Sequence, residues 1–219
     1  DGDMDLAVTN AQEGDQLVWL ENDGRKPPKF ISHDIVTTST ATFSSVAVGD
    51  LNGDGWPDLA PGILTAQAVA WFENDRGSPP SFIPRNFPPP NAEEAAGAVC
   101  ADLNGDGFQD LAMNSVNAPH QLIWYSNDGA STPSFAHSNM SDLYYRGDPF
   151  LVADLDTDGK EDILGYIEDI VPGYSCPVWF RNDGGTSPTF SACIVESLLH
   201  WSNFPPLTHM FAADMDHDG

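Results

Sequence analysis

An acidic phrase recurs along the sequence with a fixed spacing of carboxylate and amide side chains. Its complete form has Asp at positions one, five and nine, Asn or Asp at position three, and Gly at position six. Three complete copies run over 50–58, 102–110 and 154–162. The chain begins with the second half of the phrase, from Asp1 to Asp5, and ends with its first half, which holds Asp214, Asp216 and Asp218. Side-chain oxygens at this spacing can converge on one cation.

The spacing matches what a calcium site requires. Ca²⁺ is a hard cation that takes six to eight oxygen ligands, and Gly at position six permits the positive φ of a sharp reversal. The side chains at positions one, three and five then converge, the carbonyl at position seven points inward, and the Asp at position nine closes the shell. The predicted ligands are Asp50, Asn52, Asp54 and Asp58; Asp102, Asn104, Asp106 and Asp110; Asp154, Asp156, Asp158 and Asp162; Asp1 and Asp5; and Asp214, Asp216 and Asp218.

Two other interpretations of the acidic phrase are weaker. An EF-hand needs a bidentate Glu at position twelve and flanking helices, but position twelve is Pro61, Met113 or Gly165. A solvated acidic turn without an ion would crowd several carboxylates together with no cation to offset their repulsion. Magnesium is less favoured than calcium because it resists losing its waters.

A second phrase keeps step with the first. It consists of an apolar residue, Trp, a bulky residue, a variable residue and Asn-Asp, with a Phe eight residues after the Asn. Its copies begin at Val18, Ala70, Ile123 and Val178. Two linked phrases in register indicate a repeat of about fifty residues. Because the tryptophans occupy one fixed position of the repeat, we expect them in the core rather than on a sugar-binding surface.

The elements that position both phrases are predicted to be strands. The runs between turn residues are short and rich in β-branched and aromatic residues, and no apolar period of 3.6 residues persists. We predict an all-β fold of β-propeller blades, each of about four antiparallel strands with an Asp-rich calcium loop. Because both ends fall inside the same phrase, we expect a segment of a longer repeat array. The single repeat domain, 1–219, divides into approximate units 1–49, 50–101, 102–153 and 154–213, with the start of a further unit at 214–219.

These phrases resemble the FG-GAP/VCBS repeats, the units of the integrin-alpha N-terminal propeller and of many secreted microbial and algal proteins. The stretch from Phe43 to Ala60 is similar to the family consensus, and Trp-x-x-Asn-Asp followed by Phe is typical of the VCBS branch. The resemblance implies a β-propeller with calcium held between the first two strands of each blade. It leaves the activity open, since members serve in adhesion, in sugar binding and as non-catalytic parts of enzymes.

The charge balance excludes several classes of partner. The sequence has 33 Asp and Glu against 8 Lys and Arg, a formal net charge of −25. Such a chain repels nucleic-acid phosphate and lacks a basic patch for anionic membranes, and no apolar run is long enough for membrane insertion. Calcium sites of the weak, extracellular kind would stay empty at cytosolic calcium concentrations, so an extracellular or cell-surface location is expected.

Two further kinds of site fit an oxidising, secretory environment. Asn139 begins an N-glycosylation sequon with Met140 and Ser141. Cys176 and Cys193 flank the Trp run and the Phe run of the fourth unit, and a hairpin would bring them near one another as a disulfide. Cys100, in an apolar run, is expected to be a buried free thiol.

The sequence favours a non-enzymatic scaffold for adhesion or for filament or surface assembly, with other protein subunits or repeats as partners. The six histidines have no metal-ligand spacing, and no nucleophile motif accompanies them. A carbohydrate-binding propeller is the alternative, with Tyr144, Tyr145 and Trp201 as candidate glycan contacts. A propeller polysaccharide lyase, or its accessory domain, is less favoured because few cations are present to offset uronate charge.

Overall fold

All regular secondary structure in the part of the chain that the computed structural model describes is β-strand. That part comprises residues 2–10, 16–37, 41–64, 69–87, 95–115, 122–140, 151–168, 175–195, 212–213 and 215. It contains fifteen strands in four antiparallel sheets and no helix, so the predicted all-β class is confirmed. No helix in these residues has the length and hydrophobicity that a bilayer crossing would need. The predicted ligands Asp1, Asp214, Asp216 and Asp218, and the candidate glycan contacts, lie outside the described residues.

Each sheet is a meander whose strands pair in chain order. The first has three strands and the others four. The strands are β1 (Leu6–Asn10), β2 (Gln16–Asn22) and β3 (Phe30–Thr37); β4 (Phe43–Gly49), β5 (Asp58–Ile63), β6 (Val69–Asn74) and β7 (Phe82–Phe87); β8 (Ala95–Ala101), β9 (Asp110–Ser115), β10 (Leu122–Asn127) and β11 (Phe135–Asn139); and β12 (Leu151–Ala153), β13 (Asp162–Glu168), β14 (Ser175–Asn182) and β15 (Phe190–Ile194). Each four-stranded sheet therefore begins one strand before its acidic loop.

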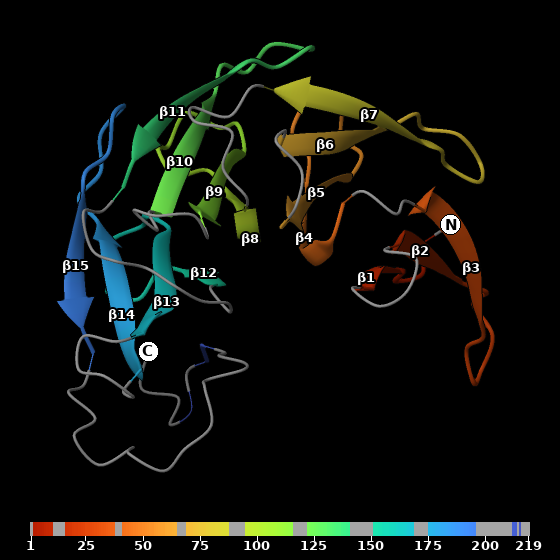
Figure 1. Ribbon diagram of the computed structural model, residues 1–219, viewed down its shortest axis with the longest axis horizontal. Coiled ribbons are helices and arrows are strands. Elements are labelled where there is room, and N and C mark those ends of the chain that lie inside the picture. The colour runs from red at the N-terminus through yellow and green to blue at the C-terminus, as the bar shows by residue number, and fades with distance from the viewer. Residues whose placement is uncertain are drawn as a thin grey trace.

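The four sheets are arranged as blades around a common centre (Figure 1). The first strand of each sheet, β1, β4, β8 or β12, lies innermost, and the last strand, β3, β7, β11 or β15, lies outermost. Strand β4 lies beside both β1 and β8, and β8 contacts β12. This arrangement is that of β-propeller blades.

The hydrophobic core lies between neighbouring sheets rather than inside any one of them. Leu17 of the first sheet packs with Phe43 and Phe72 of the second, and Leu103 of the third packs with Phe180 of the fourth. Leu51 and Trp71 of the second sheet pack with Leu111 of the third. A sheet of this kind cannot bury its faces alone, so each blade is stabilised by its neighbours.

Three of the four repeated tryptophans are buried in the core, as predicted, and the fourth is partly buried. Trp19, Trp71 and Trp124 are 7%, 3% and 6% exposed, and Trp179 is partly buried. The ring of His33 stacks on that of Trp19, with 4.3 Å between centroids. Trp71 and Trp124 belong to the clusters that join neighbouring sheets.

A glycine allows close approach of the inner strands of the second and third sheets. A Cβ atom on Gly49 would lie 2.8 Å from Cβ of Cys100, closer than real Cβ contacts come. Cys100 is a free thiol, as predicted, but it is half-buried rather than fully buried, and desolvation raises its pKa to about 12.

The predicted disulfide between Cys176 and Cys193 is wrong. Strands β14 and β15 do pair as a hairpin, but their register places Cys193 opposite Trp179, and Cys193 is a free thiol. Cys176 lies three positions before Trp179, where it faces Ile167 of β13. Three residues of strand correspond to about 10 Å, too far for a bridge.

The sequon residue Asn139 is exposed at the end of the outermost strand β11. Ser141, which completes the sequon, lies outside the described residues. Glycosylation at Asn139 stays a prediction.

We predict that Leu111→Ala lowers the free energy of unfolding by about 2–5 kcal/mol, because it leaves a cavity in a fully buried site between two sheets. Urea unfolding measures the effect. Ile31→Ala is the matched control, since Ile31 is 51% exposed on β3, and it should change the midpoint little. Equal losses in the two variants would contradict a core located between sheets.

Candidate metal centre

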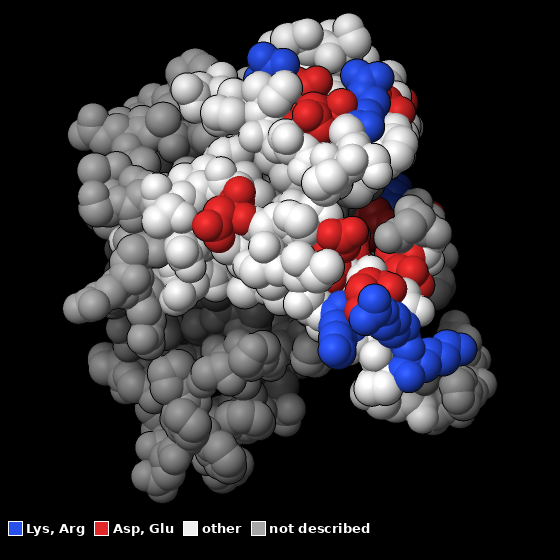
Figure 2. All heavy atoms as spheres, turned by 90° about the vertical axis from the view of Figure 1, so that its right-hand side faces the viewer, with Lys and Arg blue, Asp and Glu red and all other residues white. Residues whose placement is uncertain are grey.

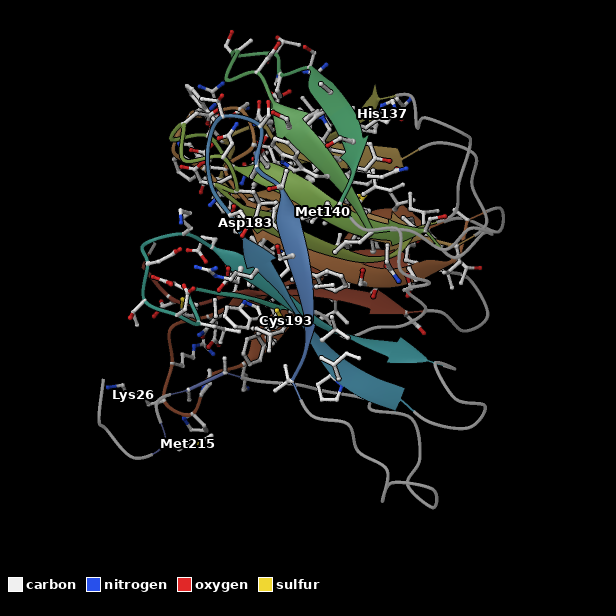
Figure 3. All side chains as sticks on the ribbon, turned by 90° about the vertical axis from the view of Figure 1, so that its left-hand side faces the viewer. Lys26, His137, Met140, Asp183, Cys193 and Met215 are labelled. Atoms are coloured by element: carbon white, nitrogen blue, oxygen red, sulfur yellow. The ribbon has the colours of Figure 1, made fainter. Side chains whose placement is uncertain are left out.

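The three complete acidic loops connect the first two strands of successive sheets. They join β4 to β5, β8 to β9 and β12 to β13. In Figure 3 the β12–β13 loop and the β14–β15 turn, at whose start Asp183 lies, are at the same end of the fourth sheet. Figure 2 shows most of the acidic side chains on its face of the molecule gathered toward one side, with basic side chains among them. The loops lie side by side, because Asn127 bonds to carbonyls in loops 50–58 and 102–110, and Asn182 bonds to carbonyls in loops 102–110 and 154–162.

The first Asp of each loop holds the turn in place through backbone amides. In the loop after β4, Oδ1 of Asp50 accepts a hydrogen bond from the Asp54 amide at 3.0 Å, and Oδ2 accepts one from the Gly55 amide at 2.8 Å. Asp102 and Asp154 accept the corresponding bonds in the next two loops. Gly55 has a φ of 87°, so the predicted left-handed reversal at position six is confirmed.

The ninth-position Asp of each loop is fully buried and bonded to the backbone. Asp58, Asp110 and Asp162 are each 0% exposed. Oδ2 of Asp58 accepts a hydrogen bond from the Leu51 amide at 3.0 Å, and Oδ1 accepts one from the Asn74 amide at 2.9 Å. The same pair of bonds forms at Asp110 and Asp162. These carboxylates therefore fasten the loop to the third strand of the same sheet, besides any role as ligands.

Burial dominates the electrostatics of two of these buried carboxyl groups. It raises the pKa of Asp58 to about 6, against the opposing effect of the Asn74 and Leu51 amides. It likewise raises the pKa of Asp110 to about 6, against the hydrogen bonds from the Asn127 amide and the Trp124 indole. Ionised carboxylates at these positions are therefore costly unless a positive charge is close.

The Asn of the second phrase is the functional residue that sequence reasoning missed. Nδ2 of Asn127 donates to the Gln109 carbonyl at 2.9 Å and to the Leu51 carbonyl of the preceding sheet at 2.7 Å. Nδ2 of Asn182 makes the same two bonds, to Glu161 and to Leu103 of the preceding sheet. The side chain thus ties its blade to the acidic loop of the blade before.

A signal for this role was present in the sequence. Every copy of the second phrase keeps the Asn, while the residue before it changes from Glu21 and Glu73 to Ser126 and Arg181. The backbone amide of each Asn bonds to a ninth-position Asp, including Asn22 to Asp5 at 2.8 Å. The two phrases keep step because they form one hydrogen-bonded unit.

Carboxylate oxygens in two loops have the environment that a cation site requires. Oδ2 of Asp54 and Oδ1 of Asp156 are buried and have no hydrogen-bond partner. Asp54 Oδ2 has Nε of Arg76 at 3.3 Å, an ion pair without hydrogen-bond geometry. Ligand oxygens of Asp154, Asp156 and Asp162 all lie within 4.8 Å of one another. These donors fit a hard divalent cation.

In the loop after β8, the side chain at position three forms hydrogen bonds with the Asp at position five. Nδ2 of Asn104 donates to Oδ2 of Asp106 at 2.8 Å, and Oδ1 of Asn104 accepts the Asp106 amide at 3.0 Å. The structure therefore brings three predicted ligands together in the loop after β12, whereas in the other two loops the side chains at positions one and three are linked through the amide at position five. Asp5 occupies the ninth position of the partial phrase at the start of the chain, and its Oδ1 accepts a hydrogen bond from the Asn22 amide.

Comparison with known families agrees with this architecture. A model described as an FG-GAP-like repeat matches residues 1–60 and 102–165, more than half of the chain. The chain belongs to the FG-GAP-like repeat family. The two matched stretches of the FG-GAP-like repeats contain all three complete acidic loops. No curated protein matches the sequence.

We predict that Asn127→Ala lowers the free energy of unfolding of the FG-GAP-like array by about 2 kcal/mol, because two buried carbonyls lose their donor. Thermal and urea unfolding measure the loss. Ser138→Ala, on the exposed face of β11, is the matched control and should leave stability nearly unchanged. An Asn127→Ala protein as stable as the control would refute the role of the amide in joining the blades.

Proposed function

We propose that the chain is a calcium-binding repeat scaffold that acts outside the cell in adhesion or in filament or surface assembly, without catalysing a reaction. The observation that carries the proposal is the set of buried carboxylate oxygens without hydrogen-bond partners in the loops after β4 and β12. The residues that would hold Ca²⁺ are those of the complete phrases, 50–58, 102–110 and 154–162. Bound calcium would offset the negative charge that these loops concentrate.

Charge repulsion is the physical reason to expect a cation here. The formal net charge is −25, and the three loops concentrate carboxylates at one end of the blades. The pKa values of Asp58 and Asp110, at about 6, lie above the unfolded value near 3.9. Their contribution to stability is therefore present below pH 4 and is lost as the pH rises through 6. A divalent cation offsets this loss at neutral pH by favouring the ionised form.

The proposed location and partners follow from the expected affinity and from the surface charge. Extracellular calcium modules bind with dissociation constants of about 10⁻⁴–10⁻³ M, which suits calcium concentrations outside the cell. We propose other protein subunits or repeats as partners, since blades of this kind gain stability from neighbours. Carbohydrate binding ranks second, because the repeated tryptophans are engaged in the core and offer little surface for stacking on a sugar.

We predict that calcium raises the melting temperature of the protein by several degrees and that a chelator lowers it, because the folded state binds the ion and the unfolded state does not. Differential scanning calorimetry measures both. A melting temperature that is the same in calcium and in chelator would refute calcium binding.

Loop 50–58 carries a built-in reporter for the same test. Trp56 stands at its seventh position, 46% exposed, and its backbone amide bonds to Oδ1 of Asp54. We predict that Tb³⁺ bound in this loop emits on excitation of Trp56 and that Ca²⁺ displaces it. Asp54→Asn should weaken the emission strongly, whereas Asp34→Asn, on the exposed strand β3, removes the same charge elsewhere and should not. Equal emission from the two variants would argue against a site in this loop.

A further inference from the structure

The acidic loop of the fourth sheet differs from the loop after β8 in its charged side chains. It has Asp156 and Glu161 where that loop has Asn104 and Gln109, and it is joined by two basic side chains. Lys160 stands at its seventh position, where the loop after β8 has Phe108. Arg181 stands immediately before Asn182, where the third sheet has Ser126. Both substitutions add a positive charge next to carboxylates that are predicted calcium ligands.

These two side chains already occupy the carboxylates of their loop. Nε of Arg181 donates to Oδ2 of Asp156 at 2.7 Å, and its Nη2 lies 3.8 Å from Oδ2 of Asp158. Nζ of Lys160 also bonds to Oδ2 of Asp158. Two of the four predicted ligands are therefore paired with charges that belong to the protein.

The two loops share one backbone pattern, so their charged side chains are the main difference between them. A Cβ atom on Gly184 would lie 2.8 Å from Cδ of Lys160, and one on Gly129 would lie 2.6 Å from Cζ of Phe108. The seventh-position side chain thus packs against the glycine of the Asn-Asp-Gly turn in both sheets. The first-position Asp and the ninth-position Asp make the same backbone bonds in both loops.

The internal cations also account for how closely the acids of the fourth sheet are gathered. Among the described residues, Asp154, Asp156 and Asp162 are the one trio of acidic, His or Cys side chains whose ligand atoms lie within 4.8 Å of one another. Uncompensated carboxylates at that separation repel strongly. Arg181 neutralises part of the charge at Asp156, so the trio can stay together without an added ion.

We propose that Arg181, assisted by Lys160, is a built-in counter-ion for the carboxylates of loop 154–162. It makes this loop bind calcium more weakly than the loop would without these cations, and depend less on calcium for its fold. This inference rests on the proposed calcium function. It divides the repeat into loops that need the ion and a loop that carries its own positive charge. Loop 50–58 is intermediate, with the single ion pair between Arg76 and Asp54.

Terbium reporters placed in single loops test the inference. In a Trp56→Phe background, Lys160→Trp places the reporter in loop 154–162, and Phe108→Trp places it in loop 102–110. Ca²⁺ displacement of Tb³⁺ gives the affinity of each loop. Adding Arg181→Ser to the first protein should tighten calcium binding about ten-fold, the effect of one charge near a divalent ion at low ionic strength. Adding Ser126→Arg to the second should weaken binding by a similar factor.

A matched control and a second readout separate this role from an ordinary structural ion pair. Arg85→Ser removes an Arg that bonds Glu73 on the outer part of the second sheet, and it should leave the affinity of loop 154–162 unchanged. In the natural sequence, Arg181→Ser should lower the melting temperature measured in chelator. Added calcium should restore the melting temperature of this variant. An equal loss in both buffers, or unchanged affinity in the reporter protein, would overturn the counter-ion role.

The outcomes also distinguish this inference from the calcium proposal itself. If Trp56 in the natural protein sensitises no Tb³⁺ and calcium moves no melting curve, the proposed function fails. If loops 50–58 and 102–110 bind calcium but Arg181→Ser leaves loop 154–162 unchanged, the counter-ion inference alone fails.

Discussion

The structure depends on a buried hydrogen-bonded unit formed by an Asp and an Asn. The Asp ends each acidic loop, and its carboxylate accepts the backbone amide of an Asn at the end of the third strand of the sheet. The amide side chains of Asn127 and Asn182 then donate to a leucine carbonyl in the acidic loop of the preceding sheet. Apolar packing also joins neighbouring sheets, but it is not directional. The Asp–Asn unit supplies the direction, because its bonds form at one relative placement of loop, strand and neighbouring blade.

Local charge makes the repeated loops unequal although their backbones follow one pattern. Each loop carries at least three aspartates, and the nearby basic residues differ from sheet to sheet. Arg76 pairs with Asp54 in the second sheet, while Lys160 and Arg181 pair with two aspartates in the fourth. In the third sheet the amide of Asn104 takes that place. One turn geometry is thus kept while the pairing of its carboxylates varies, through Arg76 and Arg181 outside the acidic phrase and through Lys160 at its variable seventh position.

Much of this architecture was predictable from the sequence because it depends on local patterns. The strands, the propeller-type blades, the acidic turns with Gly55 at positive φ and the buried tryptophans all follow from short-range residue spacing. The disulfide prediction failed because strand register is decided by pairing across the sheet, and that register places Cys193 opposite Trp179. The bonds of Asn127 to the second sheet and of Arg181 to Asp156 were missed for a related reason. They join residues 76 and 25 positions apart, and spacing within one repeat does not reveal them.

The bond from Asn127 to Leu51 has a thermodynamic consequence for the whole array. Leu51 belongs to the loop of the second sheet, and its amide is bonded to Asp58 while its carbonyl accepts from the third sheet. A change in the conformation of that loop therefore changes the free energy with which the next blade docks. By linkage, docking of that blade changes the conformational free energy of the loop by the same amount. Blades joined in this way do not respond to their surroundings one at a time. A change in one turn is transmitted to the next along the chain, and an excised blade would lose stability.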